Sequence, residues 1–357
     1  MSKAKKKIVC FIDSFTSGGA QKQMVMLVNG LHFLGIGEVQ TLQYFDIDFF
    51  EKEIDSAVKR NKIVNKNKLK SVFEIIRFFA KEEPDVIISF LHGPNNYAAL
   101  YKLLFFWRKI NLIVGERNLD IKPLGIKGLF LRISHVFANS IVCNSDAQRK
   151  LLSKYYTNSK LKFIPNGTKF NHNYFFSIKK NKIERIKLIV PARFVNQKNP
   201  LGLLKAIKDL PNVHVYWYGE IFKEFSIHKD CTRFINENFI KNFHFRPRTK
   251  NIYKELLKYD ALILPSFYEG CPNAIIDAMY CGLPVLASGV SDNLIYLKHQ
   301  NELIFDPHNI DDIINKIKTF ASLSQKRLLE ISDQNKKSAR YFFNEKKMIN
   351  NYNKLIK

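Results

Sequence analysis

The sequence predicts an α/β fold with two domains, each built on a parallel sheet. Short apolar runs, typical of buried strands, alternate with segments whose apolar residues recur at helical spacing. The chain has 357 residues, more than one hydrophobic core usually supports. The stretch from Tyr259 to Ser288 reads as strand, loop, helix and strand, which is the repeating unit of such a sheet.

Composition indicates a globular protein with an unusual charge. Hydrophobic residues make up 46% of the chain, and the formal net charge is +25. That charge suggests a polyanionic partner: nucleic acid, an anionic membrane surface or a phosphate-bearing substrate. A coding bias toward lysine and asparagine would explain it equally well, so charge alone does not choose a class.

Cysteine usage and hydropathy favour a cytoplasmic protein. The five cysteines include no Cys-x-x-Cys pair, and their odd number argues against a disulfide framework. The apolar run Ile8–Ile12 behind the basic start is too short for a secretory signal. No run of 18 apolar residues occurs, so we expect no membrane-spanning helix.

The first predicted strand, Lys7–Asp13, leads through Gly18 and Gly19 into a helix over Ala20–Leu34, a Rossmann-like opening. Gly18 and Gly19 are candidate substrate-binding residues, and an ordinary tight turn is the alternative. Further strands are predicted over residues 38–45, 62–65, 85–90, 111–114, 140–143 and 161–164, with helices over 69–81 and 96–109.

Two polar motifs follow strands in this half. His92 lies in the loop predicted over Leu91–Tyr97, at the carboxyl end of a strand, where α/β folds place catalytic groups. We therefore regard His92 as a candidate catalytic residue rather than a structural histidine. Asp46 and Asp48 form an Asp-x-Asp triplet that could hold a divalent cation, but we interpret this common triplet as a solvated loop.

Two other features leave alternatives open. The helix predicted over Asn96–Lys109 carries many bulky apolar side chains between cations, so it is either a core helix or a surface that lies on an anionic membrane. Farther on, Glu116 and Arg117 could pair with each other, or Arg117 could bind an acceptor phosphate.

A lysine- and asparagine-rich stretch over residues 171–185 is predicted to link a first domain, 1–170, to a second, 186–340. The strand over 186–192 ends in Arg193-Phe-Val-Asn-Gln-Lys198. An arginine fork and a lysine point charge at the end of a strand suit a diphosphate, and two solvated cations are the alternative.

The loop over Ser266–Asn273 combines two kinds of recognition. Glu269 can accept hydrogen bonds from hydroxyl groups. The backbone N–H groups of Asn273 and Ala274, at the start of a predicted helix, favour an anion; Pro272 has no N–H to offer. The sequence therefore predicts hydroxyl and phosphate recognition on one face.

Three motifs carry a family resemblance: Glu269-Gly-Cys-Pro-Asn273, Asp277-Ala-Met279 and Cys281-Gly-Leu-Pro-Val285. Together they resemble the donor-binding signature of the retaining glycosyltransferases of family 4 (glycosyl transferases group 1). That family has the GT-B fold, in which two Rossmann-like domains face each other across a cleft. Its signature has two glutamates, and Asp277 stands in the second position with a side chain one methylene shorter.

The resemblance implies transfer of a hexose-type sugar, with retention, from a nucleotide-diphosphate sugar to a glycan or lipid-linked acceptor. It implies no metal and no cofactor. Arg193 and Lys198 would stabilise the leaving diphosphate, Glu269 would orient the sugar, Asp277 would hold the ribose, and His92 would contact the sugar from the first domain.

The resemblance also implies a setting. The reaction would serve cell-surface polysaccharide or lipopolysaccharide biosynthesis, in the cytoplasm and peripherally on the inner face of the membrane, without a nucleic-acid partner. Residues 341–357 would form a helix that packs back on the first domain.

Three other activities fit parts of the pattern. A nucleotide-sugar epimerase would need further acid and base residues, and a glycan phosphorylase a pyridoxal cofactor. A nucleic-acid-binding module would explain the charge, but it predicts lysine and arginine clustered with aromatic residues on one surface. The lysines here are dispersed, which favours the enzyme.

Overall fold

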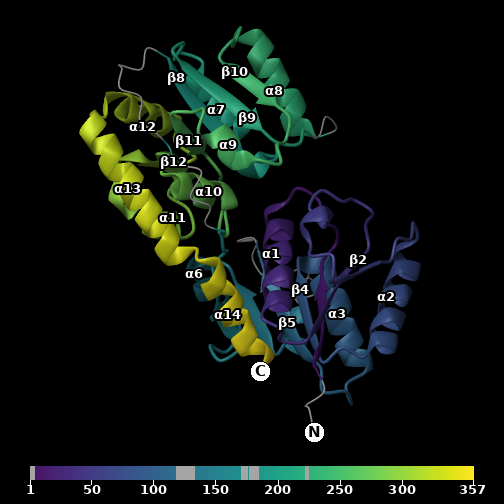
Figure 1. The fold of residues 1–357 in the computed structure, drawn as a ribbon. Coiled ribbons are helices and arrows are strands. Elements are labelled where there is room, and N and C mark those ends of the chain that lie inside the picture. The colour runs from purple at the N-terminus through teal and green to yellow at the C-terminus, as the bar shows by residue number, and fades with distance from the viewer. Residues whose placement is uncertain (1–4, 118–132, 170–175, 177–184, 222–224) are drawn as a thin grey trace. The chain divides into compact units, whose positions relative to one another are not determined.

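The chain folds into two compact α/β units in a computed structural model that describes residues 5–117, 133–169, 176, 185–221 and 225–357 (Figure 1). Unit 1 comprises Met1–Gly167 and Glu345–Lys357, and unit 2 comprises Thr168–Asn344. The first division falls at Gly167, where the sequence analysis set residue 170. The linker predicted over 171–185 lies almost wholly outside the described residues.

Unit 1 is built on a seven-stranded parallel sheet in the order β3-β2-β1-β4-β5-β6-β7. Its strands are β1 (Lys7–Phe11), β2 (Glu38–Gln43), β3 (Lys59–Lys62), β4 (Val86–Phe90), β5 (Asn111–Glu116), β6 (Ser140–Cys143) and β7 (Leu161–Phe163). Its described helices are α1 (Gly19–Phe33), α2 (Lys68–Glu82), α3 (His92–Leu104), α5 (Ile133–Phe137), α6 (Asp146–Leu152) and α14 (Glu345–Ile356), with a 3₁₀ turn at Glu51–Glu53.

Alternate side chains of each strand feed two cores, one on either face of the sheet. On β1, Ile8 and Cys10 join the core that α1 and α14 complete, whereas Val9 and Phe11 join the core that α2, α3 and α6 complete. Burial on both faces explains why these strands read as continuous apolar runs in the sequence.

Two predicted elements of unit 1 start at other residues than expected. The third strand occupies Lys59–Lys62 rather than 62–65, because β3 is a charged strand at the sheet edge and carries no apolar pattern. The helix α3 starts at His92 rather than Asn96. Leu91 makes the turn from β4 with a φ of 78°, and Pro94 is tolerated in the first helical turn, where its missing N–H costs nothing.

Unit 2 is built on a six-stranded parallel sheet in the order β10-β9-β8-β11-β12-β13. Its strands are β8 (Ile186–Pro191), β9 (Val213–Tyr218), β10 (Phe243–Arg246), β11 (Ala261–Leu264), β12 (Val285–Ser288) and β13 (Ile304–Phe305). Its helices are α7 (Pro200–Ile207), α8 (Ser226–Glu237), α9 (Ile252–Leu256), α10 (Asn273–Cys281), α11 (Asn293–Tyr296), α12 (Ile310–Ser322) and α13 (Gln325–Phe342), with 3₁₀ turns at Asn196–Lys198 and Lys298–Leu303.

Each sheet reverses its strand order once. In unit 1 the reversal lies between β1 and β4, and in unit 2 between β8 and β11. Ligands of open α/β sheets bind outside the carboxyl ends of the strands at such a point. The loops after these four strands are therefore where a site is expected.

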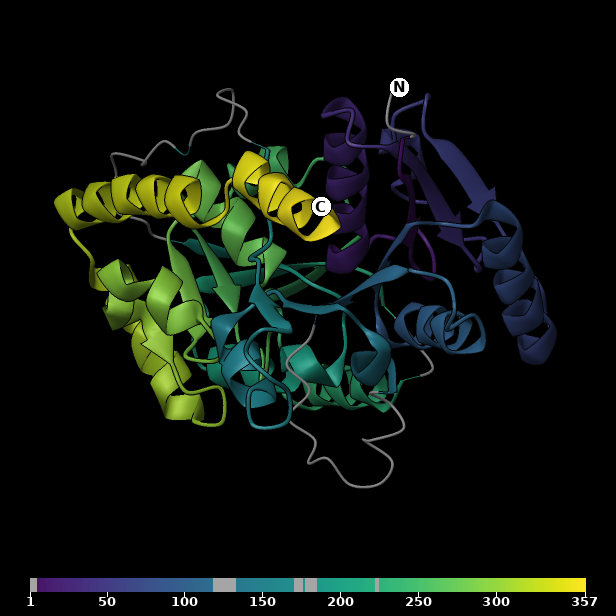
Figure 2. The same cartoon turned by 90° about the horizontal axis from the view of Figure 1, so that it is seen from below.

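The last helix, α14, packs against α1 in unit 1, and both views show the two side by side (Figure 1, Figure 2). Gly30 of α1 permits this approach, because a Cβ there would lie 2.1 Å from Cδ1 of Ile349. Tyr352 of α14 is fully buried and accepts a hydrogen bond from Arg117 at 2.8 Å. The C-terminal segment is thus part of the core of unit 1.

All five cysteines are buried and unbridged. Every helix within the described ranges is too short or too polar to cross a lipid bilayer.

Candidate functional site

In unit 2, the loops after β8 and β11 are bonded to each other. The N–H of Phe267 donates to the carbonyl of Gln197 at 2.9 Å, and the side-chain amide of Gln197 donates to the carbonyl of Tyr268 at 2.8 Å. These loops carry the two motifs that the sequence analysis assigned to the diphosphate and the donor sugar. The reversal of strand order therefore brings both motifs to one edge.

Lys198 and Glu269 form an ion pair at this edge. The Lys198 Nζ donates to Oε1 of Glu269 at 2.5 Å, and the two side chains are only 15% and 6% exposed. Removing either partner would leave a poorly solvated charge, which is costly in a folded protein. The pair therefore fixes both groups in place before any ligand arrives.

The backbone around this pair is anchored on both sides. Asn199 adopts a φ of 51°, its side chain accepts from the N–H of Gly202 at 3.0 Å, and it donates to the carbonyl of Pro307 at 2.9 Å. The helix predicted to follow it is confirmed as α7. Such pinning matters because a loop that positions charges must not move with its ligand.

Arg193 stands exposed just beyond the end of β8. The neighbouring turn after β9 packs tightly against it, since a Cβ on Gly219 would lie 1.9 Å from the carbonyl oxygen of Ala192. Only glycine fits there, so Gly219 helps to set the path of the chain that carries Arg193.

The predicted helix over Asn273–Cys281 is confirmed as α10, with Pro272 as its N-cap residue. The N–H groups of Ile275 and Ile276 bond to the carbonyl of Pro272, and Asn273 and Ala274 occupy the first two helical positions. The start of α10 therefore lies at the same edge as Lys198 and keeps the geometry expected for an anion.

A third loop joins this edge from the other side of β11. The hydroxyl of Ser291, which follows β12, donates to the carbonyl of Gly270 at 2.9 Å. One turn into α10, Asp277 is only 5% exposed and accepts a hydrogen bond from the hydroxyl of Tyr253 at 2.9 Å. No sequence pattern pointed to Tyr253, because it lies 24 residues away from Asp277, on α9.

In unit 1, Gly18 is the N-cap residue of α1 and Gly19 is its first residue. A Cβ on Gly18 would lie 2.0 Å from Oε1 of Gln21, so glycine makes room for that side chain. Gln21 in turn donates to Oδ1 of Asp13 at 3.1 Å. The two glycines thus sit beside a carboxylate at the end of β1.

Asp13 is a candidate that the sequence analysis missed. It is half-buried, and burial raises the pKa of its carboxyl group even though Gln21 and Ser14 donate hydrogen bonds to it. Its negative charge adds to the effect of burial in raising the pKa of Tyr44. The sequence pattern that could have pointed to Asp13 is an acidic residue after a strand and before two adjacent glycines.

His92 opens α3 at the end of β4, across the reversal of strand order from Gly18. The hydroxyl of Tyr44 lies close to Gly93, the next residue, because a Cβ built on Gly93 would be 2.5 Å from that hydroxyl. Leu91 has φ 78° and ψ 155°, which glycine adopts far more readily than leucine. Backbone strain of this kind gathers at functional sites, so it supports His92 as a site residue.

The structure gives Glu116 and Arg117 separate roles. Glu116 pairs with the buried His135 at 2.7 Å. The guanidinium of Arg117 donates to Asn166 at 3.1 Å and to Tyr352 at 2.8 Å, and it lies 3.5 Å from the ring centroid of Phe90. Arg117 is only 8% exposed, so it holds unit 1 together rather than awaiting a phosphate.

The Asp-x-Asp triplet is paired with a lysine. The Nζ of Lys62 contacts Asp46 at 3.4 Å, Glu51 at 3.2 Å, and Asp48 more closely. A lysine among these carboxylates takes the place that a cation would occupy. Across the described part of the chain, no three side chains are grouped so as to hold a metal ion.

Two parallel sheets, with candidate ligand loops at the single reversal of each, define a two-domain α/β protein of the GT-B fold. Anabaena HepE, solved with UDP and glucose, superposes with a TM-score of 0.82 at 17% identity, over 97% of this chain and 98% of that one. Sucrose-phosphate synthase from Thermosynechococcus elongatus superposes with a TM-score of 0.81 at 14% identity, over 98% of both chains.

Residues 173–338 match the family described as glycosyl transferases group 1, a stretch that covers nearly all of unit 2. Along most of its length the chain is similar to glycosyltransferases. It is 24% identical over 342 residues to a Campylobacter jejuni enzyme named GalNAc-alpha-(1->4)-GalNAc-alpha-(1->3)-diNAcBac-PP-undecaprenol alpha-1,4-N-acetyl-D-galactosaminyltransferase, covering 92% of this chain and 90% of that protein. It is 22% identical over 361 residues to an Escherichia coli enzyme named UDP-Gal:alpha-D-GlcNAc-diphosphoundecaprenol alpha-1,3-galactosyltransferase. That match covers 88% of this chain and 90% of that protein.

Proposed function

We propose that this glycosyltransferase moves a hexose-type sugar from a nucleotide-diphosphate sugar to a lipid-linked glycan, with retention, in cell-surface polysaccharide or lipopolysaccharide biosynthesis. The observation that carries the donor half of this proposal is the ion pair between Lys198 and Glu269 at the strand reversal of unit 2. It joins a cation suited to phosphate with a carboxylate suited to sugar hydroxyls.

The donor would be held almost entirely by unit 2. Lys198 and Arg193 neutralise the diphosphate, and the N–H groups of Asn273 and Ala274 donate hydrogen bonds to its oxygens. Glu269 orients the sugar through its hydroxyls. Because fixed cations and a helix start supply positive charge to the leaving group, the mechanism needs neither a divalent metal nor a cofactor.

Retention follows if the acceptor hydroxyl attacks on the face that the diphosphate leaves. The bond from the anomeric carbon to the phosphate oxygen breaks, and a bond from that carbon to the acceptor oxygen forms. The proton of the acceptor passes to the departing phosphate oxygen, so no protein base is required. His92, Gly18 and Gly19 contribute from unit 1, where they line the reversal between β1 and β4.

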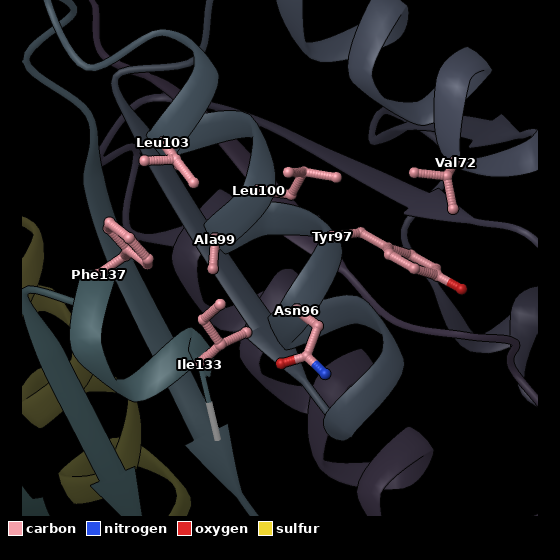
Figure 3. Close-up of a pocket in the computed structure, with 8 residues that line it drawn as sticks. All are labelled: Val72, Asn96, Tyr97, Ala99, Leu100, Leu103, Ile133 and Phe137. Carbon is pink, nitrogen blue, oxygen red and sulfur yellow. The ribbon is translucent and has the colours of Figure 1, made fainter. Parts of the chain in front are cut away.

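The acceptor half of the proposal is supported by a groove of about 300 Å³ in unit 1 (Figure 3). Figure 3 shows Leu100 and Leu103 of α3 on one wall, with Ile133 and Phe137 of α5 and Val72 of α2 around them. The lining is almost wholly apolar. An apolar groove beside a polar site suits a substrate with a hydrocarbon chain.

The groove starts close to the candidate site. Asn96 and Tyr97 line its polar end, one turn along α3 from His92. The side-chain oxygen of Asn96 is buried and has no hydrogen-bond partner among the described residues. A buried acceptor of this kind needs a donor, which a sugar hydroxyl or an amide N–H of the acceptor supplies.

Beyond the groove, the chain leaves α3 with exposed aromatic side chains. Phe106 and Trp107 are 78% and 64% exposed. Nearby, Lys102 is partly buried, and burial together with the charge of Lys160 lowers its pKa. Exposed rings followed directly by Arg108 and the exposed Lys109 fit the headgroup region of an anionic membrane, so this end of unit 1 would rest peripherally on the bilayer.

Transfer assays test the proposal. Purified protein is incubated with UDP-, GDP- and ADP-linked sugars and either a polyprenyl-diphosphate-linked saccharide or the same saccharide without lipid. We expect transfer from one donor, faster to the lipid-linked saccharide, and NMR of the product to show the anomeric configuration of the donor. An inverted product would contradict retention, and equal rates with both acceptors would contradict the lipid-linked assignment.

A further inference from the structure

The candidate nucleotide subsite contains a hydrogen-bonded chain centred on Tyr253 of α9. The Tyr253 hydroxyl lies 2.9 Å from Oδ1 of Asp277 on α10 and 3.0 Å from the hydroxyl of Thr168. Its ring packs edge-on against Tyr280 of α10, with centroids 5.6 Å apart. A tyrosine thus spans two helices and an extended segment of unit 2.

The direction of this chain follows from Asp277. Tyr253 donates its single hydroxyl proton to Asp277, so its oxygen must accept the hydrogen bond from Thr168. Asp277 is 5% exposed and Thr168 is 1% exposed, so water cannot replace either contact at low cost. The three groups therefore form one ordered unit.

We propose that Tyr253 is a positioning residue for the nucleotide, because its hydroxyl holds the carboxylate of Asp277 in the orientation that accepts the ribose hydroxyls. This inference rests on the proposed donor. An aspartate is one methylene shorter than a glutamate, so its oxygens need a fixed direction to reach a ligand. The bond from Tyr253 supplies that direction and the ring contact with Tyr280 holds Tyr253 in turn.

Thr168 connects this chain to the start of unit 2. Its N–H donates to the carbonyl of Phe343 at 2.8 Å, and it forms an isolated parallel bridge with Asn344. Residues 168 and 344 are the first and last of unit 2. Through Tyr253, the ribose subsite is therefore anchored to both ends of the unit.

Tyr253→Phe tests the proposal by comparing ligands with and without a ribose. Titration calorimetry on the full chain measures binding of UDP, GDP and ADP, of the 2′,3′-dideoxy form of the best binder, and of inorganic pyrophosphate. We expect Tyr253→Phe to weaken the best nucleotide by about tenfold, the size of a lost hydrogen bond to a charged group. Binding of pyrophosphate and of the dideoxy form should be unchanged.

Two further variants sharpen the result. Thr168→Val removes only the distal bond, so we expect a smaller loss that is again confined to ligands with ribose hydroxyls. Tyr259→Phe is the matched control, since its hydroxyl bonds to that of Tyr218 in the same unit, and its binding should equal that of the unmodified chain.

The outcomes separate this inference from the proposed function. If the unmodified chain binds a nucleotide and Tyr253→Phe binds it equally well, the positioning role is wrong and the donor assignment stands. If Tyr253→Phe weakens pyrophosphate as much as the nucleotide, Tyr253 merely supports the fold and the inference is again overturned. If the unmodified chain binds none of the three nucleotides, the donor assignment and this inference both fail.

Discussion

At the scale of single residues, the pairing of Lys198 with Glu269 would keep the proposed donor site in place before the donor binds. An unpaired lysine at this loop would bind phosphate without selectivity. An unpaired buried glutamate would lower the free energy of unfolding. Because the two groups pair at 2.5 Å, each charge lowers the free-energy cost of burying the other. A donor that brings both a diphosphate and sugar hydroxyls can then engage both groups together.

Glu269→Gln keeps the shape of the side chain and removes its charge. We expect kcat/KM to fall by about 100-fold or more, as when one preorganised polar group is lost from an active site. Steady-state transfer kinetics measure this. The control is Glu302→Gln, which removes the charge of another carboxylate of unit 2 that pairs with an arginine at 2.6 Å; wild-type kinetics are expected. Equal losses in both variants would mean that Glu269 acts through stability alone.

Asp13→Asn tests the buried acid of unit 1 through its pH dependence. Burial raises the folded-state pKa of Asp13, so the folded state binds its proton more tightly than the unfolded state does. The ionised form therefore lowers the free energy of unfolding above that pKa, and the cost disappears as pH falls through it. Asp13→Asn should thus be more stable than wild type at about pH 8, with the difference fading toward about pH 4.

Urea unfolding across that pH range measures the difference. The exposed Asp209, whose side chain is 81% accessible, provides the matched control, and Asp209→Asn should follow the wild-type curve throughout. A stability difference for Asp13→Asn that stays constant with pH would refute the role of the charge.

At the scale of elements, α3 combines three features that the sequence placed in one segment. Its start carries His92, its middle lines the apolar groove, and Phe106 and Trp107 follow its end. Of the two open alternatives for this segment, the core helix is confirmed in part, and the membrane surface stays a proposal. Ala98, Ala99 and Tyr101 belong to the core, and the exposed rings lie beyond the last turn.

Membrane contact predicts a loss on replacing those rings. In sedimentation with vesicles of phosphatidylglycerol and phosphatidylcholine, the double variant Phe106→Ser with Trp107→Ser should bind at least about tenfold more weakly, because both rings leave the interface. Phe33→Ser, on a ring that is 88% exposed in α1, should bind as the wild type does. The assignment is wrong if the double variant binds like the control, or if neutral vesicles bind as well as anionic ones.

Element types were predicted well where the pattern was apolar and poorly where it was not. The strand and helix at Asp260–Cys281 were predicted from their apolar spacing and occur as β11 and α10. The charged strand β3 and the start of α3 at His92 were misplaced. In both cases tertiary structure decided the boundary, through pairing at the sheet edge and through the strained turn at Leu91.

At the scale of the whole molecule, the sequence motifs acquire their meaning from strand order. Arg193, Lys198 and Glu269 follow the two strands beside the reversal in unit 2, as Gly18 and His92 do in unit 1. Local sequence predicts that each of these residues follows a strand. It does not predict which strands are neighbours in the sheet. Tyr253 and Asp13 could not be predicted for the same reason, because the packing of the fold, and not their spacing in the sequence, sets their hydrogen-bond partners.

The net charge of +25 now has a partial physical explanation. Arg193 and Lys198 would serve the proposed diphosphate site, while other lysines neutralise local carboxylates, as Lys62 does near Asp48. A glycosyltransferase that uses an anionic donor at an anionic surface gains from long-range attraction of both. The charge therefore agrees with the proposed substrates without requiring a nucleic acid.

The central claim is that unit 2 binds a nucleotide-diphosphate sugar through Arg193, Lys198 and Glu269. Thermal unfolding of the full chain with saturating UDP, GDP or ADP tests it most directly. One nucleotide at about 100 times its Kd should stabilise the protein by about 2.7 kcal/mol and raise its Tm by several degrees. Arg193→Ala should lose most of that rise, and the exposed Arg233→Ala should keep it. Absence of a rise with all three nucleotides, or an undiminished rise in Arg193→Ala, would contradict the claim.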